Sequence, residues 1–412
     1  MRMLVIEHTS WIEMMCHAWR MCGVEVVYMH LQAPSMTSNE EARFQGARSI
    51  LQAVADVDPD FIVDINGVGV LPLDESGANW TTERVDVPWC EWWWNAPHHC
   101  SFPLHRTEES AAYVRALRHE SVLHFFWDAV VGREYQAWLA RPCFHLPTAT
   151  HTGLFHPDAI AACDRYYPPV ELAFLGAYYP LPRKSELSKI HELARFCLHH
   201  REDTYFDVAR PGQGSFEAFK KALDKSLQSA EGPFHPDVLR WKTVLDQIVG
   251  YERRTVYLHR ILEEVQRSCF AGAGWPDVFS PQEALYQPAH VVTRYQTSLF
   301  CPDFSNAQQF TGTTMRCYEI MASGGVLLCG RFPDFDPTGE WEDKIYLAYS
   351  TPDECMEKIR EYRSDSRLLQ ALRDNARAFV VERHTWSHRL SDLIKALTCW
   401  APSTKQEVAA AT

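Results

Sequence analysis

The chain has 412 residues, 46% of them hydrophobic and 23% charged, which is the composition of a folded protein long enough for two domains. Its formal net charge of −13 argues against general nucleic-acid binding, which requires a basic surface. No apolar run approaches the roughly 20 residues that cross a bilayer, and Glu7 and His8 interrupt the first one, so we expect neither a membrane span nor a signal peptide.

Six short apolar segments in the first part of the chain are β-branched or aromatic and continuous, which is typical of parallel strands covered on both faces. Helical stretches such as 40–57 and 109–118 separate them. The series predicts a doubly wound sheet in a first domain, residues 1–150. The predicted strands are residues 3–6, 24–29, 61–65, 89–94, 122–127 and 143–146.

A proline-punctuated, mostly polar run, residues 151–170, is interpreted as an interdomain linker. A second series of predicted strands follows in a domain of residues 171–384, interrupted by a long helical insert at 216–266. Two such domains would form a cleft between them, where ligands usually bind. The strands of this second series are predicted at residues 171–175, 204–208, 269–272, 298–301, 326–329 and 345–348.

The C-terminal part is predicted to be helical and to end in a disordered, Ala-rich tail at 401–412. Residues 385–400 form an amphipathic last helix whose apolar residues fall on one stripe. The stripe consists of Trp386, Leu390, Leu393, Ile394 and Leu397.

Polar residues follow the predicted strands of the first domain. In an open parallel sheet, functional groups collect at the carboxyl ends of the strands. Each of these residues by itself is of a type that is common in loops. Together they predict a polar surface along this edge of the sheet. Trp92, Trp93 and Trp94 either form an apolar surface on which a sugar ring binds or pack in the core of the sheet. The polar set is His8, Asn66, Asn95, His98 and Asp128.

Residues 315–330, MRCYEIMASGGVLLCG, predict a short helix that runs into a glycine turn and a buried strand. Arg316 and Glu319 are three positions apart and therefore neighbours on the helix. Gly324 and Gly325 allow a tight turn and a close approach of backbone to a ligand. The two charges form either an exposed helix pair or a clamp for the hydroxyls and phosphates of a nucleotide sugar.

The 13 cysteines show no repeated framework, as expected for reduced thiols, so we expect a cytoplasmic protein. Cys90, His98, His99 and Cys100 are close in sequence and are potential metal ligands. They lack the paired spacing of structural zinc sites. We therefore expect no metal site, and regard buried thiols and site histidines as the better interpretation.

Several segments resemble the CgeB-like glycosyltransferases, relatives of the GT-B enzymes that use nucleotide-sugar donors. The resemblance extends across most of the chain and implies a GT-B fold, in which two Rossmann-like doubly wound domains face a central cleft and the C-terminal helix crosses back to the first domain. The segments are DPDFIVDIN, VPWCEWWWNAP, HLPTATHTGLFHP, LAFLGAYYPLPRKSEL, CFAGAGWPD, TTMRCYEIMASGGVLLCG and ERHTWSHRLSDLI.

The resemblance also implies roles for individual residues of a donor site. Glu319 would bind the hydroxyls of the donor sugar or ribose, and Arg183 and Lys184 would neutralise the diphosphate, whose charge grows as the glycosidic bond breaks. Backbone N–H groups that precede the helix of Arg316 would contact the same phosphates in place of a metal. They belong to Gly312, Thr313 and Thr314; Gly324, whose backbone can approach a ligand closely, is a further donor-site candidate from the sequence itself.

The sequence thus predicts a metal-independent, hexosyltransferase-like enzyme with no cofactor beyond its nucleotide-sugar co-substrate. Asn66 and Asn95 would bind the acceptor, although the family often has Asp where Asn95 precedes Ala96-Pro97 here. An inverting reaction requires a general base, for which His8, His98 and Asp128 are candidates. A nucleotide-sugar epimerase and a non-catalytic binding or scaffold protein remain alternatives. The sugar, the base, the acceptor and the stereochemistry stay open.

Overall fold

The computed structural model describes residues 1–7, 12–31, 39–100, 102–105, 107–178, 236–279, 281–304 and 309–400. Contacts divide the chain into two compact units, Met1–Ala149 with Thr385–Thr412, and Thr150–His384. No helix in these described ranges is long and apolar enough to cross a membrane.

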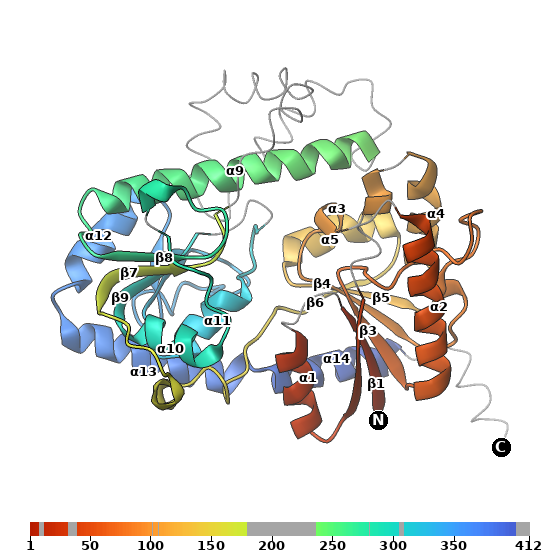
Figure 1. The fold of residues 1–412 in the computed structure, drawn as a ribbon, viewed down its shortest axis with the longest axis horizontal. Coiled ribbons are helices and arrows are strands. Elements are labelled where there is room, and N and C mark those ends of the chain that lie inside the picture. Colours follow the sequence, from red (N-terminus) through yellow and green to blue (C-terminus); the bar gives the residue numbers. More distant parts are fainter. Residues whose placement is uncertain are drawn as a thin grey trace. The chain divides into compact units, whose positions relative to one another are not determined.

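The first unit contains a parallel sheet of six strands in the order β2-β1-β3-β4-β5-β6 (Figure 1). The sheet residues of β1, β3, β4 and β5 are almost all fully buried, as continuous apolar strands covered on both faces should be. All six predicted strands of this half are confirmed. They are β1 (Arg2–Glu7), β2 (Glu25–His30), β3 (Phe61–Ile65), β4 (Trp89–Trp93), β5 (Val122–Phe126) and β6 (Cys143–His145).

Helices connect these strands, and polar side chains fix where two of them begin. Asn39 accepts a hydrogen bond from the Ala42 N–H at the start of α2 (Glu40–Val57), and Asp128 does the same for α5 (Ala129–Leu139). The other helices of this unit are α1 (Ile12–Met21), η2 (Thr81–Glu83), α3 (Pro97–Cys100), η3 (Phe102–His105) and α4 (Thr107–Leu117).

The last helix, α14 (Trp386–Trp400), belongs to the first unit and packs on α1, as the fold prediction requires. The Trp19 indole donates to the Trp386 carbonyl at 2.8 Å, and the Arg389 guanidinium donates to the Thr148 carbonyl at 3.2 Å. Trp386, Leu390 and Leu393 of the predicted apolar stripe are buried, and Arg389 is buried with them. The predicted tail after residue 400 lies outside the described residues.

The second unit has a parallel sheet in the order β11-β10-β9-β7-β8. Five of its six predicted strands are confirmed; the one predicted at 204–208 lies outside the described residues. The observed strands are β7 (Val170–Leu175), β8 (Ser268–Ala271), β9 (Ser298–Asp303), β10 (Leu327–Gly330) and β11 (Leu347–Tyr349).

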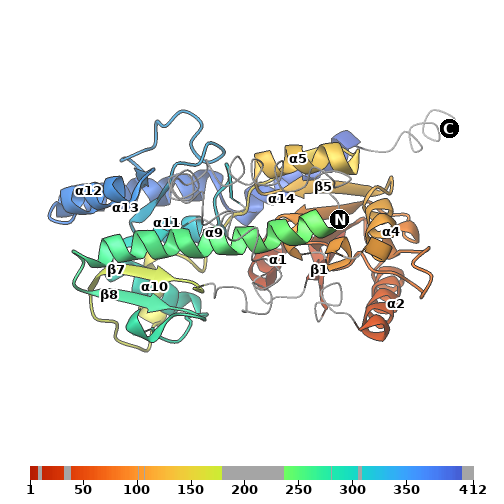
Figure 2. The ribbon, with the colours of Figure 1, turned by 90° about the horizontal axis from the view of Figure 1, so that it is seen from above.

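Of the predicted helical insert, the described part begins with α9 (Pro236–Leu262). Tyr257, Leu258 and Ile261 of α9 belong to the same core cluster as Leu172 and Phe174 of β7, so the C-terminal half of α9 covers this sheet (Figure 2). The remaining helices of the unit are η4 (Pro157–Ala162), η5 (Asp277–Phe279), α10 (Pro288–Gln296), α11 (Met315–Ala322), α12 (Pro352–Tyr362) and α13 (Ser366–Arg383).

Candidate functional site

A buried carboxylate organises the carboxyl end of the second sheet. Asp303 is the last residue of β9, and its side chain is 1% exposed. Arg316 Nη1 lies 2.8 Å from Asp303 Oδ1, and the Thr314 hydroxyl donates to Oδ2 at 3.1 Å. The ion pair offsets the burial of the Asp303 charge and fixes the first turn of α11 against the end of β9.

Two arginines stack on one aromatic ring at this sheet end. The guanidinium carbon of Arg316 lies 5.0 Å from the centre of the Phe174 ring, and that of Arg254 lies 5.6 Å from it. Arg254 comes from α9 and donates to the Ala177 carbonyl at 2.5 Å. Sequence reasoning missed both Arg254 and Asp303, since only the packing of α9 and β9 places them beside Arg316. The two guanidinium groups bring two positive charges to the end of β7, and the charge of Arg316 is paired with that of Asp303.

Two glycines allow the backbone to come close at this point. A Cβ on Gly176 would lie 2.5 Å from Arg316 Nη2, and a Cβ on Gly272 would overlap the Gly176 carbonyl oxygen. The Trp275 indole donates to the same carbonyl at 2.8 Å. The backbone segments that follow β7 and β8 thus contact each other, and the Arg316 guanidinium packs against the first of them. The signal for Gly272 was present in the glycine-rich strand end CFAGAG.

Glu319 lies one turn after Arg316 in α11 but is not its ion-pair partner. The interpretation of these two residues as an exposed helix pair is therefore wrong, because Arg316 pairs with Asp303 instead. Glu319 is only 7% exposed, and its Oε1 has no hydrogen-bond partner among the described residues. Burial raises the pKa of Glu319 to about 7, and the charge of Arg316 opposes that rise. A buried acceptor without a donor is rare in proteins and calls for an explanation.

The other predicted donor-site residues surround α11. Thr314 is its N-cap residue, and the Thr313 hydroxyl donates to the Tyr318 hydroxyl at 3.0 Å. The first N–H groups of a helix have no partner within the helix and favour an anion. Gly312 precedes this turn. Gly324 has φ +77° just after the C-cap residue of the helix, a conformation that favours glycine. The predicted diphosphate ligands Arg183 and Lys184 lie outside the described residues.

In the first unit, the structure brings the two predicted acceptor ligands together. The Asn66 Oδ1 accepts from the backbone N–H groups of Trp94 at 2.8 Å and Asn95 at 3.1 Å. Asn66 itself has φ +62°. Its side-chain oxygen therefore ties the loop after β3 to the loop after β4. An acceptor contact by Asn66 would have to use the amide nitrogen.

Two buried acids beneath these loops were not anticipated from the sequence. Asp64 and Glu91 are directly paired across β3 and β4, and both are fully buried. Glu91 accepts from the Gly67 N–H at 2.5 Å, and Asp64 accepts from the Gly69 N–H at 2.9 Å. Burial raises the pKa of Asp64 to about 7, and burial and the neighbouring Asp64 charge raise the pKa of Glu91 as well. The pair holds the loop that carries Asn66.

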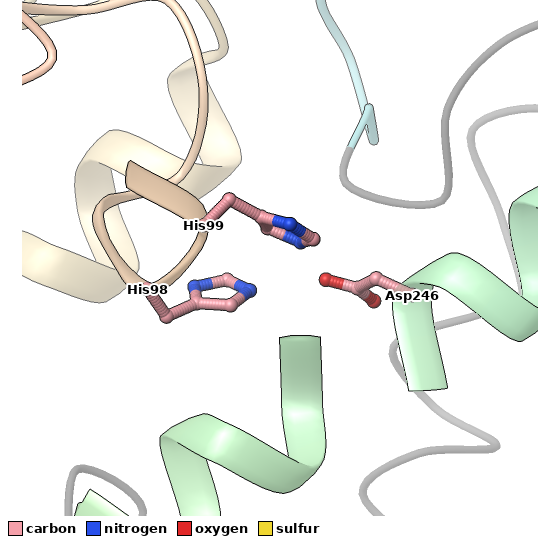
Figure 3. Close-up of side chains that lie close together, drawn as sticks. All are labelled: His98, His99 and Asp246. Carbon is pink, nitrogen blue, oxygen red and sulfur yellow. The ribbon is translucent and has the colours of Figure 1, made fainter. Parts of the chain in front are cut away.

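The predicted acid–base candidates have structural partners where the structure describes them. His98 is buried in α3, and its Nδ1 lies 2.6 Å from the Tyr135 hydroxyl. Its ring centre lies 4.5 Å from that of the neighbouring His99 (Figure 3). Asp128 is fully buried and caps α5 through bonds from Val130 and Val131. His8 lies outside the described residues. A catalytic role for the three stays a prediction.

The interpretation of the tryptophans as a sugar platform is wrong for two of the three. Trp92 and Trp93 are fully buried in the first sheet. Trp94 stacks on Trp386 of α14, with ring centres 5.5 Å apart and an interplanar angle of 9°. The run thus fills the core and anchors the last helix.

Comparison with solved structures decides the fold. A sucrose-phosphate synthase from Thermosynechococcus elongatus superposes with a TM-score of 0.53 at 11% identity, over 97% of this chain and 99% of that one. An alpha-glucosyltransferase in complex with UDP-glucose and abasic-site DNA gives 0.52 at 10% identity, over 97% and 99%. An alpha,alpha-trehalose-phosphate synthase from Burkholderia vietnamiensis gives 0.51 at 10% identity, over 97% and 100%. The fold is that of the GT-B glycosyltransferases.

A family comparison agrees with this fold. Residues 253–395 match the family model described as glycosyl transferase-like. This range contains Arg254, Asp303, Arg316 and Glu319, so the cluster at the end of the second sheet lies inside the matched region. No curated protein sequence matches the chain.

Proposed function

We propose that the chain is a glycosyltransferase of the CgeB-like, hexosyl-transferring type. It moves a sugar from a nucleotide-sugar donor to an acceptor without a metal or other cofactor. The donor binds the second unit at Arg254, Asp303, Arg316 and Glu319. The observation that carries the proposal is the buried Oε1 of Glu319, which has no hydrogen-bond partner within the described part of the chain and lies one helical turn from the Arg316–Asp303 ion pair.

Each group of this cluster has a physical task toward such a donor. A hydroxyl of the sugar or ribose would donate to Glu319, supplying the hydrogen bond that this oxygen lacks. Arg316 and Arg254 would face the diphosphate, together with the N-terminus of α11, Gly312 and Thr313. Preoriented positive groups of this kind stabilise a leaving group that gains negative charge. Arg183 and Lys184 would add to the same field.

The first unit would supply the acceptor side. Asn66, Asn95, His98 and Asp128 follow its strands, at the edge where parallel sheets carry functional groups. Histidine titrates near neutrality, so His98 and His8 are the proposed bases if the reaction inverts the anomeric centre.

Ligand-dependent stability tests the donor site, because a ligand that binds only the native state raises its melting temperature. We expect UDP and UDP-glucose to stabilise the protein, by about 2.7 kcal/mol at 100 times Kd. UDP-glucose is the first probe because a structure of similar fold was determined with it. E319Q should weaken UDP-glucose binding by about tenfold or more through the lost charge-assisted hydrogen bonds.

The control is E357Q, which changes an exposed glutamate of α12. R254M, compared with R267M at an exposed arginine, tests the diphosphate contact with UDP alone. Unchanged UDP-glucose affinity in E319Q, with R254M and R267M also alike, would place the donor elsewhere.

A further inference from the structure

Two carboxyl groups lie side by side in the interior of the first unit, on the neighbouring strands β3 and β4 (Figure 1). Asp64 is the register partner of Glu91, and both side chains are fully buried. No lysine or arginine in the described part of the chain pairs with either of them. Two adjacent carboxylates in a dry interior repel each other strongly, so we expect the pair to keep one proton between them.

The hydrogen bonds of the pair indicate which carboxyl carries that proton. Glu91 Oε1 accepts from the Gly67 N–H at 2.5 Å, whereas Glu91 Oε2 has no donor within the described ranges. Burial raises the pKa of both groups, and the Asp64 charge raises that of Glu91 further. The hydrogen bond between the two carboxyls then adds to the rise for Glu91 and opposes it for Asp64. This is the pattern of a protonated Glu91 that donates from Oε2 to Asp64.

The other titratable groups that face the pair supply no positive charge. The imidazole in register with the glutamate is neutral, because burial lowers its pKa to about 4. Two thiols stay protonated, because burial and the glutamate charge raise their pKa values. A third acid adds to the rise in the pKa of Asp64 after burial, and an indole opposes the rise in both carboxyls. These groups are His124 of β5, Cys90 of β4, Cys100 of α3, Glu7 of β1 and Trp89 of β4.

The loop after β3, residues 66–71, lies directly against this pair. It is buried, and its first two residues, Asn66 and Gly67, have φ +62° and +68°. Asp64 accepts from the Gly69 N–H at 2.9 Å, and a Cβ on Gly69 would lie 3.0 Å from Asp64 Oδ2. The strands beneath are held by ladder bonds on both sides, whereas the loop is held by the two carboxyls. Repulsion between two ionised carboxyls would therefore displace the loop before it displaces the strands.

We propose that Asp64 and Glu91 are positioning residues, which hold the loop of Asn66 in place while they share one proton and release it when that proton is lost to solvent. Water then reaches the separated carboxylates, and the loop N–H groups become open to exchange. The pKa of Asp64, raised to about 7 by burial, puts the change near neutrality. The statement about the loop concerns the first unit alone; its consequence, weaker acceptor binding at alkaline pH, rests on the proposed function.

Hydrogen–deuterium exchange of the full chain from about pH 6 to 8.5 tests the proposal, with labelling times adjusted to the intrinsic exchange rate at each pH. We expect the peptide that contains Gly67 and Gly69 to lose protection above about pH 7, by at most tenfold per pH unit, the limit for loss of one proton. A peptide from β9 of the second unit is the internal reference and should keep its protection.

E91Q separates the shared proton from ordinary packing. Its amide keeps an oxygen for the Gly67 N–H and donates to Asp64 as a protonated glutamate does, but it has no proton to lose. The protection of the loop in E91Q should therefore be constant over the whole range. E120Q, at an exposed glutamate before β5, should respond to pH as the wild type does. D64N also leaves a single carboxyl and should be as flat as E91Q, so it serves as a second variant.

The proposal is overturned if the wild-type loop keeps constant protection from about pH 6 to 8.5, or if E91Q and D64N lose protection as the wild type does. Donor binding is a separate measurement. A wild-type protein that fails to bind UDP-glucose would contradict the proposed function and leave the exchange result on the loop unaffected.

Discussion

Asp303 and Glu319 are two buried carboxylates at the carboxyl end of the second sheet, and they differ in their partners. Asp303 is buried but paired with Arg316 at 2.8 Å and receives the Thr314 hydroxyl. Glu319 is buried without a described donor to its Oε1. The Glu319 oxygen is therefore a hydrogen-bond acceptor that a ligand could use, whereas the Asp303 carboxylate is already paired. The proposed donor site is based on this difference.

The raised pKa of Glu319 predicts pH-dependent donor binding. Its pKa is about 7 in the folded protein, so the carboxyl is mostly protonated at pH 5 and ionised above pH 7. Donor hydroxyls hydrogen-bond more strongly to the ionised form. We expect UDP-glucose affinity, measured by calorimetry, to rise between about pH 5 and 7 and then level off. E319Q should bind with a flat profile over this range; a wild-type profile that is equally flat contradicts the assignment.

The close approach of β7, β8 and α11 explains why glycine occurs at two strand ends. At Gly176 a Cβ would meet the movable end of the Arg316 side chain, whereas at Gly272 it would meet backbone. Replacement by alanine should therefore mainly affect ligand binding at Gly176 and mainly affect stability at Gly272.

G176A should mainly displace Arg316, weakening UDP binding more than it lowers stability, while G272A should destabilise the fold. The overlap at Gly272 cannot be relieved by a rotamer change, so we expect its loss to reach about 1–3 kcal/mol or more in denaturant unfolding. G77A is the reference, because Gly77 has φ +59° with open space around it and reports the cost of a Cβ at positive φ without overlap; at Gly272, φ +146° adds backbone strain of its own. Equal losses of stability in G176A and G272A would show that the Arg316 side chain does not move to make room for the new Cβ.

Helix α14 is attached to the first unit through Trp386, which stacks on Trp94 and is buried. W386A should lower the free energy of unfolding by about 3–5 kcal/mol, the range for a large aromatic removed from a core. K395A, at an exposed position on the same helix, should change it by less than about 0.5 kcal/mol. Urea unfolding measures both, and a W386A loss as small as that of K395A would mean that α14 adds little to the first unit.

Across the whole molecule, buried carboxyls in both units set the pH dependence of stability. Asp64, Glu91 and Glu319 all have pKa values raised above those of an unfolded chain. The folded protein then binds more protons than the unfolded one, so stability is greatest below about pH 4 on this account and declines as pH rises through about 7. Other titratable groups also contribute to the pH dependence of stability. A comparison of variants is therefore needed to isolate the contribution of these carboxyls.

E91Q keeps an oxygen for the Gly67 N–H and removes one ionisation from the Asp64 pair. We expect its melting temperature, measured by calorimetry from pH 5.5 to 8, to fall less steeply with pH than that of the wild type. E75Q, at an exposed glutamate of the same unit, is the control. A slope as steep as that of the wild type would mean that Glu91 is not the titrating group.

The sequence alone determined the strands and the fold class, because continuous apolar runs, glycine turns and helix periodicity are local properties of the chain. It also singled out Glu319 and Arg316 within one helix. Only the tertiary structure decided that Arg316 pairs with Asp303, that Arg254 shares its aromatic ring, and that Asp64 faces Glu91. These partners are 13 or more residues apart or lie on separate elements. Strand register and helix packing bring such residues together, and both follow from long-range burial that no local window of sequence contains.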